Sequence, residues 1–323
     1  MKNLKPWKQQ ICAIHSAYFT RKEALQSLPL MHRETAPKVS SENIFLIESS
    51  CNPQPTFRTW CSVESWASQH PDKIVWFILV SPFINDGFRV SQSLLSQYSN
   101  IRVVTSDLEE TFKETPLWDL FNSDKWLKKT SWPESNLSNM VRGALVWKWG
   151  GIYSDTDSIC IRSTSKIANA VGMYEADKVN GAVLIGQPRH KVYWMLMEYI
   201  KQNFRGDKWG VNGPHAITNV MYEFCNASTF EGIAKSGQGC GTMKVLSPEA
   251  FYPIPYGKNR AYTQARRTTN LSKLFKDSYV LHFWNKLTKN TPVRPKGHSI
   301  LYTAAKTFCP VTCKIATSHS NFF

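Results

Sequence analysis

The sequence contains no apolar run of the length that crosses a membrane. A spanning helix needs roughly 20 consecutive apolar residues, whereas the longest stretch here, residues 74–80, has the length of a β-strand. Residues 1–20 are basic, and Lys, Gln and His interrupt their apolar residues, so they lack the pattern of a signal peptide. We therefore expect a chain without a visible transmembrane anchor.

No two cysteines have the C-x-x-C spacing, which argues against a zinc ribbon and a thioredoxin-type motif. The eight cysteines are an even number, which permits disulfides in an oxidising compartment. Cys225 and Cys240 flank a loop rich in Gly and Ser and are the best candidate pair, a closure worth ~3 kcal/mol in the chain-entropy model. The alternative is two buried free thiols. Three N-x-S sequons, at Asn136, Asn226 and Asn270, also permit a secretory protein.

No block of five or six like charges occurs, although Lys and Arg outnumber Asp and Glu by 39 to 24, a net charge of +15. Scattered basic residues favour a solvated surface, or one that attracts anionic donors and lipids, over a nucleic-acid-binding stripe. The mean hydropathy of -0.34 and the hydrophobic content of 42% exclude collagen-like, disordered and coiled-coil classes. The aromatic content of 13% suits a core and also stacking sites for sugars.

The chain shows no internal repeat and no segment of linker composition. Residues 1–42 are polar and irregular, and we expect them to form an N-terminal arm outside the core. Residues 43–323 are expected to form one compact domain.

Buried strands alternate with helical patterns in the first half of this domain. Strands are predicted over residues 44–47, 74–80 and 101–104, with a helix over 57–67 and a short helix around Leu94. This order implies right-handed parallel crossovers, and hence an α/β fold with a mostly parallel, Rossmann-like sheet flanked by helices. Ligands of such sheets bind at the carboxyl ends of the strands.

A longer helix precedes the most informative motif. Apolar residues at 137, 140, 141, 144 and 145 form one helix face, and the pair Gly150-Gly151 ends the helix. A short strand at 152–153 then leads to Asp155 and Asp157. Further elements are predicted as a strand over 182–185, helices over 191–204 and 215–224, and a strand-like segment over 279–284.

Asp155 and Asp157 are two carboxylates at a strand end, and oxygen ligands of this kind suit Mn²⁺ or Mg²⁺. A cation held there can neutralise the charge of a departing nucleotide diphosphate. Gly150 and Gly151 would let backbone approach a nucleotide, and Tyr153 would offer it a ring or hydroxyl. The alternative is a polar turn. A calcium loop is disfavoured because the next alternate position is Ile159.

Several ordered stretches together resemble one family. They are Leu137-Ser138-Asn139-x-x-Arg142, Leu145-x-Trp147-Lys148-x-Gly150-Gly151-Ile152-Tyr153-x-Asp155-Thr156-Asp157, Trp209-Gly210-x-x-Gly213-Pro214 and His282-x-Trp284-Asn285-Lys286. These resemble the α-1,4-glycosyltransferases with a DXD sugar-binding motif, over nearly the whole chain from about Ile44 to Cys309. The resemblance implies a GT-A catalytic domain over residues 43–323, a UDP-sugar donor and Mn²⁺. It also implies retaining transfer in α-1,4 linkage to a galactose-ended glycan, often a glycosphingolipid, by a type II Golgi membrane protein.

The resemblance also assigns roles to residues of this chain. It implies that Asp155, Asp157 and Asn180 serve catalysis near the sugar, and that His282 completes a metal site with the two aspartates. Contacts to the donor are implied for Asn139, Arg142, Gly150, Gly151, Tyr153, Trp284 and Lys286.

Each of these roles has a structural alternative. A lone histidine is more often structural, Lys286 can be an ordinary surface lysine, and Asn180-Gly181 can be a turn. Trp209 and Tyr252 could stack on an acceptor galactose or be buried. Because a front-face mechanism lets a donor phosphate oxygen take the acceptor proton, no base is assigned, although Glu48 and Glu64 are candidate acids.

Position 139 departs from the family pattern, in which Asp typically stands three residues before the arginine. On a helix, residues 139 and 142 share a face, and Asn139 lacks the charge of an aspartate. We expect weaker catalysis or an altered donor preference. Other hypotheses remain: a GDP-mannose-dependent mannosyltransferase, a non-catalytic carbohydrate- or nucleotide-binding homologue, and, least favoured, a nucleic-acid binder.

Overall fold

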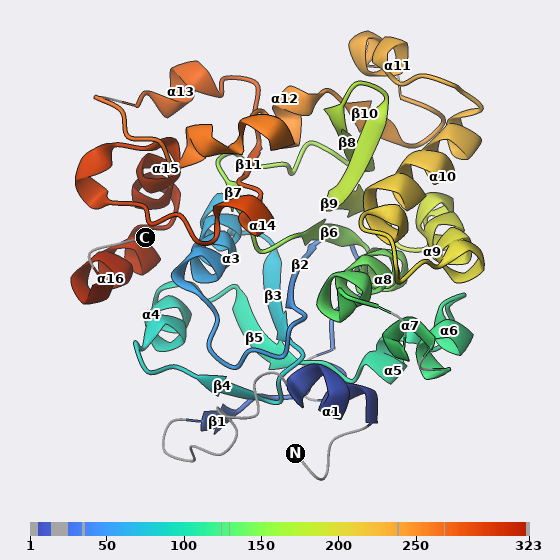
Figure 1. Cartoon of the computed structure of the whole chain (residues 1–323), viewed down its shortest axis with the longest axis horizontal. Coiled ribbons are helices and arrows are strands. Elements are labelled where there is room, and N and C mark those ends of the chain that lie inside the picture. Colours follow the sequence, from blue (N-terminus) through green and yellow to red (C-terminus); the bar gives the residue numbers. More distant parts are fainter. Residues whose placement is uncertain are drawn as a thin grey trace.

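A seven-stranded sheet runs through the middle of the computed structural model (Figure 1). The structure describes residues 6–13, 25–33, 36–123, 125–128, 130–237, 239–267 and 269–320. Only β9 runs antiparallel to its two neighbours, so the sheet is mostly parallel, as expected. In spatial order the strands are β10 (Lys244–Leu246), β8 (Ala170–Glu175), β9 (Lys178–Gly186), β6 (Gly151–Ser154), β2 (Asn43–Glu48), β3 (Ile74–Leu79) and β5 (Ile101–Thr105).

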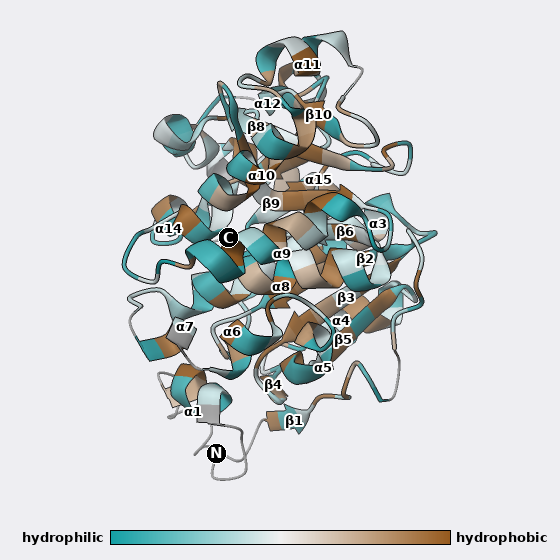
Figure 2. Cartoon of the chain, turned by 90° about the vertical axis from the view of Figure 1, so that its right-hand side faces the viewer, coloured by the Kyte–Doolittle hydropathy of each residue, from teal (hydrophilic) through white to brown (hydrophobic). Residues whose placement is uncertain are grey.

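The central strands are apolar on both faces because helices cover both faces (Figures 1 and 2). Successive residues of a strand point to opposite sides. Ile44 and Leu46 of β2 accordingly pack into one hydrophobic cluster, and Phe45 and Ile47 pack into the other. The first cluster includes α3 (Phe57–Gln69), α4 (Val90–Gln97), α15 (Ile300–Phe308) and α16 (Pro310–Ser320); the second includes α8 (Pro133–Trp149), α9 (Lys191–Asn203) and α10 (Ala216–Cys225).

Shorter elements surround this framework. Two small antiparallel sheets pair β1 (Leu25–Ser27) with β4 (Phe83–Asn85) and β7 (Ser158–Cys160) with β11 (Val280–His282). The remaining helical segments are α1 (Pro6–Cys12), α5 (Leu108–Phe112), α6 (Trp118–Asn122), α7 (Lys125–Lys128), η3 (Val211–His215), α11 (Glu231–Ser236), α12 (Pro248–Phe251), η4 (Tyr256–Tyr262), α13 (Leu271–Leu274), α14 (Asn285–Thr288) and η5 (Pro295–Gly297).

Trp7, Ile11, Cys12 and Met31 of residues 1–42 pack into the core, so the expectation that this whole segment lies outside the core is wrong. Trp7 and Ile11 lie four residues apart on α1, which puts both on one helix face, and both are buried. Cys12 forms a disulfide with Cys51, and Met31 is fully buried. The parts of the expected arm at 1–5, 14–24 and 34–35 lie outside the described residues. The division into an arm and a domain starting at residue 43 stays a prediction.

Three disulfides hold the described chain together. The expected bond between Cys225 and Cys240 is confirmed. Sequence reasoning did not pair Cys12 with Cys51, or Cys61 of α3 with Cys309 between α15 and α16. The two other cysteines are free thiols in the interior. Disulfides of this number are typical of oxidising compartments.

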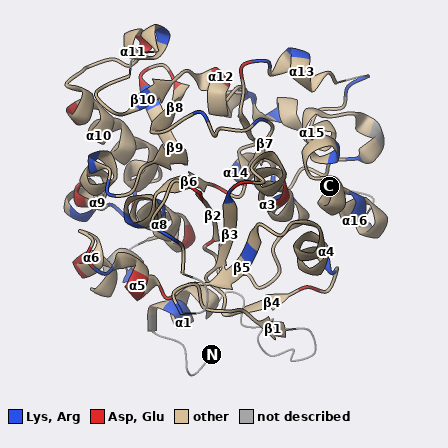
Figure 3. Cartoon of the chain, turned by 180° about the vertical axis from the view of Figure 1, so that it is seen from behind, with Lys and Arg blue, Asp and Glu red and all other residues tan. Residues whose placement is uncertain are grey.

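The outer surface carries charge of both signs without a basic stripe. Figure 3 shows Lys and Arg distributed over both helical layers. Among the described residues, no helix combines the length and apolar character that crossing a bilayer requires.

Candidate metal and donor site

Asp155 follows directly after β6, at the carboxyl end of this central strand. Its backbone N–H donates to the carbonyl of Ala182 on neighbouring β9 at 2.8 Å, which fixes the start of the loop. The chain then reverses into β7, and Asp157 lies in the turn between the two strands. The expectation that a polar site lies at a strand end is therefore met by this placement.

The carboxylate of Asp155 is oriented by side chains from α8 and β6. Arg142 donates to its Oδ1 at 3.0 Å, and the Tyr153 hydroxyl donates to the same oxygen at 2.7 Å. Ser138, one helical turn before Arg142, contacts both donors: its hydroxyl lies 2.8 Å from that of Tyr153 and accepts from Arg142 at 3.0 Å. This network engages one oxygen of Asp155.

Asp157 pairs with a histidine from far along the chain. Because β11 pairs with β7 in a register that sets His282 opposite Ser158, His282 is brought beside the turn. Its Nε2 lies 3.1 Å from Oδ1 of Asp157, and the backbone N–H of Asn285 donates to Oδ2 at 2.8 Å. The strand pairing therefore closes the site from the C-terminal part of the chain.

Burial and charge act differently on the two carboxylates. Desolvation raises the pKa of Asp155, and Arg142 opposes this rise without cancelling it. Desolvation would also raise the pKa of Asp157, but His282 and the hydrogen bonds outweigh it, so the pKa of Asp157 is lowered. Burial would lower the pKa of His282, but Asp157 outweighs it and the pKa of His282 is raised. Asp157 is thus the more readily ionised member of the aspartate pair.

The side chains present fit a divalent cation. Ligand atoms of Asp155, Asp157 and His282 all lie within 4.8 Å of one another. The nitrogen of His282 that faces Asp157 is Nε2, at 3.1 Å from Oδ1, and this atom is the ligand that the imidazole offers on the side of the aspartates. The side chains of Asp155 and Asp157 are 24% and 19% exposed, so a nucleotide can reach an ion bound to them. The two carboxylates are oxygen donors of the kind that Mn²⁺ and Mg²⁺ bind.

Gly150 and Gly151 lie at the opposite end of β6 from the aspartates, so their expected contact with a nucleotide is wrong. Gly150 has φ of 74° and Gly151 has φ of 104°, a region that favours glycine. A Cβ on Gly151 would lie 2.1 Å from the carbonyl oxygen of Asn43. The two glycines permit close packing of the sheet's amino edge, which is a structural role.

Tyr153 and Trp284 support the site from within the core. Tyr153 is buried and directs its hydroxyl to Asp155, so its ring does not present a stacking surface. Trp284 is also buried, donates from Nε1 to the carbonyl of Ile254 and packs edge-on against His282 at 4.4 Å between ring centres. Both residues position ligands instead of offering an open face to the donor.

Asn180 lies on β9 and Asn139 lies on α8. The side-chain oxygen of Asn180 accepts from the Ala182 N–H at 3.0 Å, which is local turn chemistry. A Cβ on the adjacent Gly181 would lie 3.1 Å from Arg142, which places this turn next to the guanidinium. The carboxamide of Asn139 faces Gly213, where a Cβ would lie 2.8 Å from its oxygen.

Two expected sugar platforms differ in exposure. Tyr252 is fully buried and donates its hydroxyl toward the Asn180 carbonyl, so it cannot stack on an acceptor. Trp209 is 46% exposed. The Nζ of Lys286 lies 3.1 Å from the centre of its indole ring, so Lys286 contacts an aromatic face in this structure.

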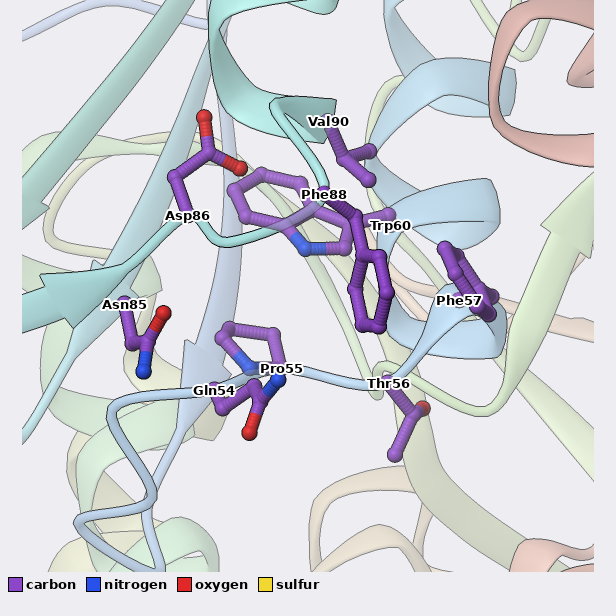
Figure 4. Close-up of a pocket in the computed structure, with 9 residues that line it drawn as sticks. All are labelled: Gln54, Pro55, Thr56, Phe57, Trp60, Asn85, Asp86, Phe88 and Val90. Atoms are coloured by element: carbon purple, nitrogen blue, oxygen red, sulfur yellow. The ribbon is translucent and has the colours of Figure 1, made fainter. Parts of the chain in front are cut away.

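A hollow separate from the aspartates lies beside the loops that follow β2 and β3 (Figure 4). Its volume is about 240 Å³, and Trp60, Phe57 and Phe88 form much of its lining. Asp86 is its one carboxylate, and both its oxygens are engaged by Ser91 and Gln92 at the start of α4. Because this hollow has no converging ionisable groups, we place the chemistry at Asp155, Asp157 and His282.

Sequence reasoning missed Ser138 as a functional residue. Its position four residues before Arg142, on the same helix face, was the available signal. It also missed the backbone N–H of Asn285, which no side-chain motif can reveal.

Parts of the chain are similar in sequence to known glycosyltransferases. Residues 185–316 match the family model "Alpha 1,4-glycosyltransferase conserved region", and residues 56–176 match "Glycosyltransferase sugar-binding region containing DXD motif". Lactosylceramide 4-alpha-galactosyltransferase of Homo sapiens is 32% identical over 84% of this chain and 76% of its own length. Alpha-1,4-N-acetylglucosaminyltransferase of Homo sapiens is 28% identical over 83% and 79%. A solved structure of galactosyltransferase LgtC shares 15% identity over 84% of this chain and 95% of that chain, with a TM-score of 0.40.

Proposed function

Since this chain belongs to the α-1,4-glycosyltransferase family with a DXD motif and a GT-A fold, we propose that it is a metal-dependent retaining hexosyltransferase. The family is one of glycosyltransferases that use nucleotide-sugar donors and a divalent cation. The proposed donor is UDP-galactose, UDP-N-acetylgalactosamine or UDP-N-acetylglucosamine. The proposed acceptor is a galactose-ended glycan, foremost a glycosphingolipid, reached in the Golgi lumen at a membrane surface.

One observation carries the proposal: Asp155 and Asp157 of one turn and His282 of the distant strand β11 place their ligand atoms within 4.8 Å of one another. These residues would hold Mn²⁺ or Mg²⁺. When bound, the cation would act as a Lewis acid on the departing diphosphate. Arg142, Tyr153 and Ser138 keep Asp155 oriented, and Trp284 keeps His282 oriented, so the ligands are arranged before the donor arrives.

The transfer itself needs no base from this chain in a front-face reaction. The bond from the sugar C1 to the phosphate oxygen breaks, the acceptor hydroxyl oxygen bonds to C1 on the same face, and the phosphate oxygen takes its proton. The two candidate acids are engaged elsewhere. Glu64 is buried against the start of α16, and Glu48 accepts two hydrogen bonds from Ser50.

A donor panel tests the proposal. The three UDP-sugars and GDP-mannose are offered with Mn²⁺, with Mg²⁺ or with excess chelator, first for hydrolysis and then for transfer to lactosylceramide. Asp157→Ala should lower the rate ~10²–10³-fold. Asp119→Ala, which removes a carboxylate that is 78% exposed, should leave the rate unchanged. Full activity in chelator or in Asp157→Ala refutes the metal role. Preference for GDP-mannose supports the mannosyltransferase hypothesis, and binding of UDP without turnover of any donor supports the non-catalytic one.

A further inference from the structure

Two tryptophans and a lysine form an aromatic platform next to the metal site. The rings of Trp132 and Trp209 meet edge to face, with 5.3 Å between their centres and 74° between their planes. Trp209 is 46% exposed, and Trp132 is half-buried. Lys286 lies over both rings, with its Nζ 3.1 Å from the centre of Trp209 and 5.7 Å from that of Trp132. These three residues are called the Trp platform below.

Buried amides hold the two tryptophans in place. Trp132 immediately precedes α8, and Trp209 lies just before η3. Asn212 of η3 donates to the side-chain oxygen of Asn136 on α8 at 2.9 Å, and both asparagines are buried. Asn212 also exchanges hydrogen bonds with the backbone of Arg205. The platform is therefore a built feature, because the segments that carry its rings are tied together beneath it.

The lysine connects the platform to the metal site. Lys286 follows Asn285, whose backbone N–H donates to Asp157, so the two sites share one short helix. A nucleotide diphosphate bound at Asp157 would offer charged oxygens to this ammonium group. A contact between an exposed lysine and an aromatic face is weak, and a charge-assisted hydrogen bond to phosphate is stronger.

We propose that Trp209 and Trp132 are the stacking platform for the terminal hexose of the acceptor, and that Lys286 covers it until a donor diphosphate draws the lysine away. This inference rests on the proposed function and names its acceptor site. The apolar face of a pyranose suits an exposed indole, which Lys286 occupies in this structure. Movement of one side chain then makes acceptor binding follow donor binding.

Direct binding of methyl β-lactoside tests whether Lys286 covers the Trp platform. Saturation-transfer NMR is recorded on the whole chain, with and without UDP and Mn²⁺. The original chain should bind the lactoside only when UDP and Mn²⁺ are present. Lys286→Met should bind it without them, and Trp209→Ala should bind it under neither condition. If Lys286→Met and the original chain bind the lactoside equally without UDP, Lys286 does not cover the site. If Trp209→Ala binds the lactoside as the original chain does, Trp209 is not part of the acceptor site.

Kinetics separate this inference from the proposed function. Trp209→Ala should raise KM for the acceptor at least tenfold, and Trp209→Phe should restore part of the loss. The matched control is Trp194→Ala, a 37% exposed tryptophan on α9 that packs against Trp147. An original chain that turns over no UDP-sugar refutes the proposed function, while lactoside binding still decides the platform. If Trp209→Ala transfers normally with an unchanged KM for the acceptor, the Trp platform is refuted and the proposed function stands.

Discussion

Removing the hydroxyl of Tyr153 should weaken metal binding without exposing the site. Tyr153→Phe keeps the buried ring and deletes the 2.7 Å hydrogen bond to Asp155, together with the contact to Ser138. A hydrogen bond to a charged group contributes ~1.5–3 kcal/mol, and each 1.4 kcal/mol is about tenfold in an equilibrium constant. Loss of a partner that orients a metal ligand costs roughly 10–100-fold in metal affinity. We therefore expect the Mn²⁺ dissociation constant to rise about tenfold or more.

Tyr193→Phe is the matched control for this variant. Tyr193 is also buried, and its hydroxyl donates to the backbone carbonyl of Ile185 at 2.7 Å, away from the aspartates. Its loss should reduce the free energy of unfolding by ~0.5–1.5 kcal/mol and leave the metal affinity unchanged. Mn²⁺ binding is measured by titration calorimetry, and unfolding by urea. The reasoning fails if both variants bind Mn²⁺ as tightly as the original chain, or if both weaken binding equally.

Three further predictions follow from other contacts. Asn139→Asp should raise transfer or shift the preferred UDP-sugar in the donor panel, and an unchanged rate and preference would contradict this. Glu64→Ala removes the buried carboxylate that accepts from two N–H groups at the start of α16. The free energy of unfolding in urea should therefore fall by roughly 2–4 kcal/mol. A fall of less than about 0.5 kcal/mol would show that these two hydrogen bonds are dispensable. In secretory expression, glycans should attach at Asn226 and Asn270, which are exposed. No glycan should attach at Asn136, because its side chain is buried and its amide donates to Thr130. Glycosidase treatment with peptide mapping checks each site, and a glycan at Asn136 would contradict this prediction.

The sequence indicated those features that depend on local pattern. The strands at β2, β3 and β5 and the helix α8 follow from runs and periodicity within a few residues. The aspartate pair was found because strand, turn and carboxylates are contiguous. The role of the glycine pair was wrong, since spacing along the chain does not show which edge of the sheet a residue occupies. Gly151 and Asp155 are four residues apart, yet they lie at opposite ends of β6.

Long-range pairing could not be obtained from such patterns. His282 reaches Asp157 only because β11 pairs with β7, two three-residue strands separated by more than a hundred residues. The same limit applies to the bond between Cys61 and Cys309, whose sequence separation is 248. Resemblance to a family supplied His282, because a motif retained around a residue carries information that periodicity lacks.

The structure also changes what an aspartate at position 139 would do. The helix pattern alone suggested that a carboxylate there would pair with Arg142, since the two positions share a face. In the structure, Arg142 already donates to Asp155 and to Ser138, while the carboxamide of Asn139 faces Gly213. A new carboxylate would therefore act on the side of η3, away from the ligand atoms of the metal site. Asn139→Asp should therefore change the donor preference and KM for the donor and leave the Mn²⁺ dissociation constant unchanged. Tyr153→Phe should show the opposite division, so the two variants together separate orientation of the metal ligand from recognition of the sugar.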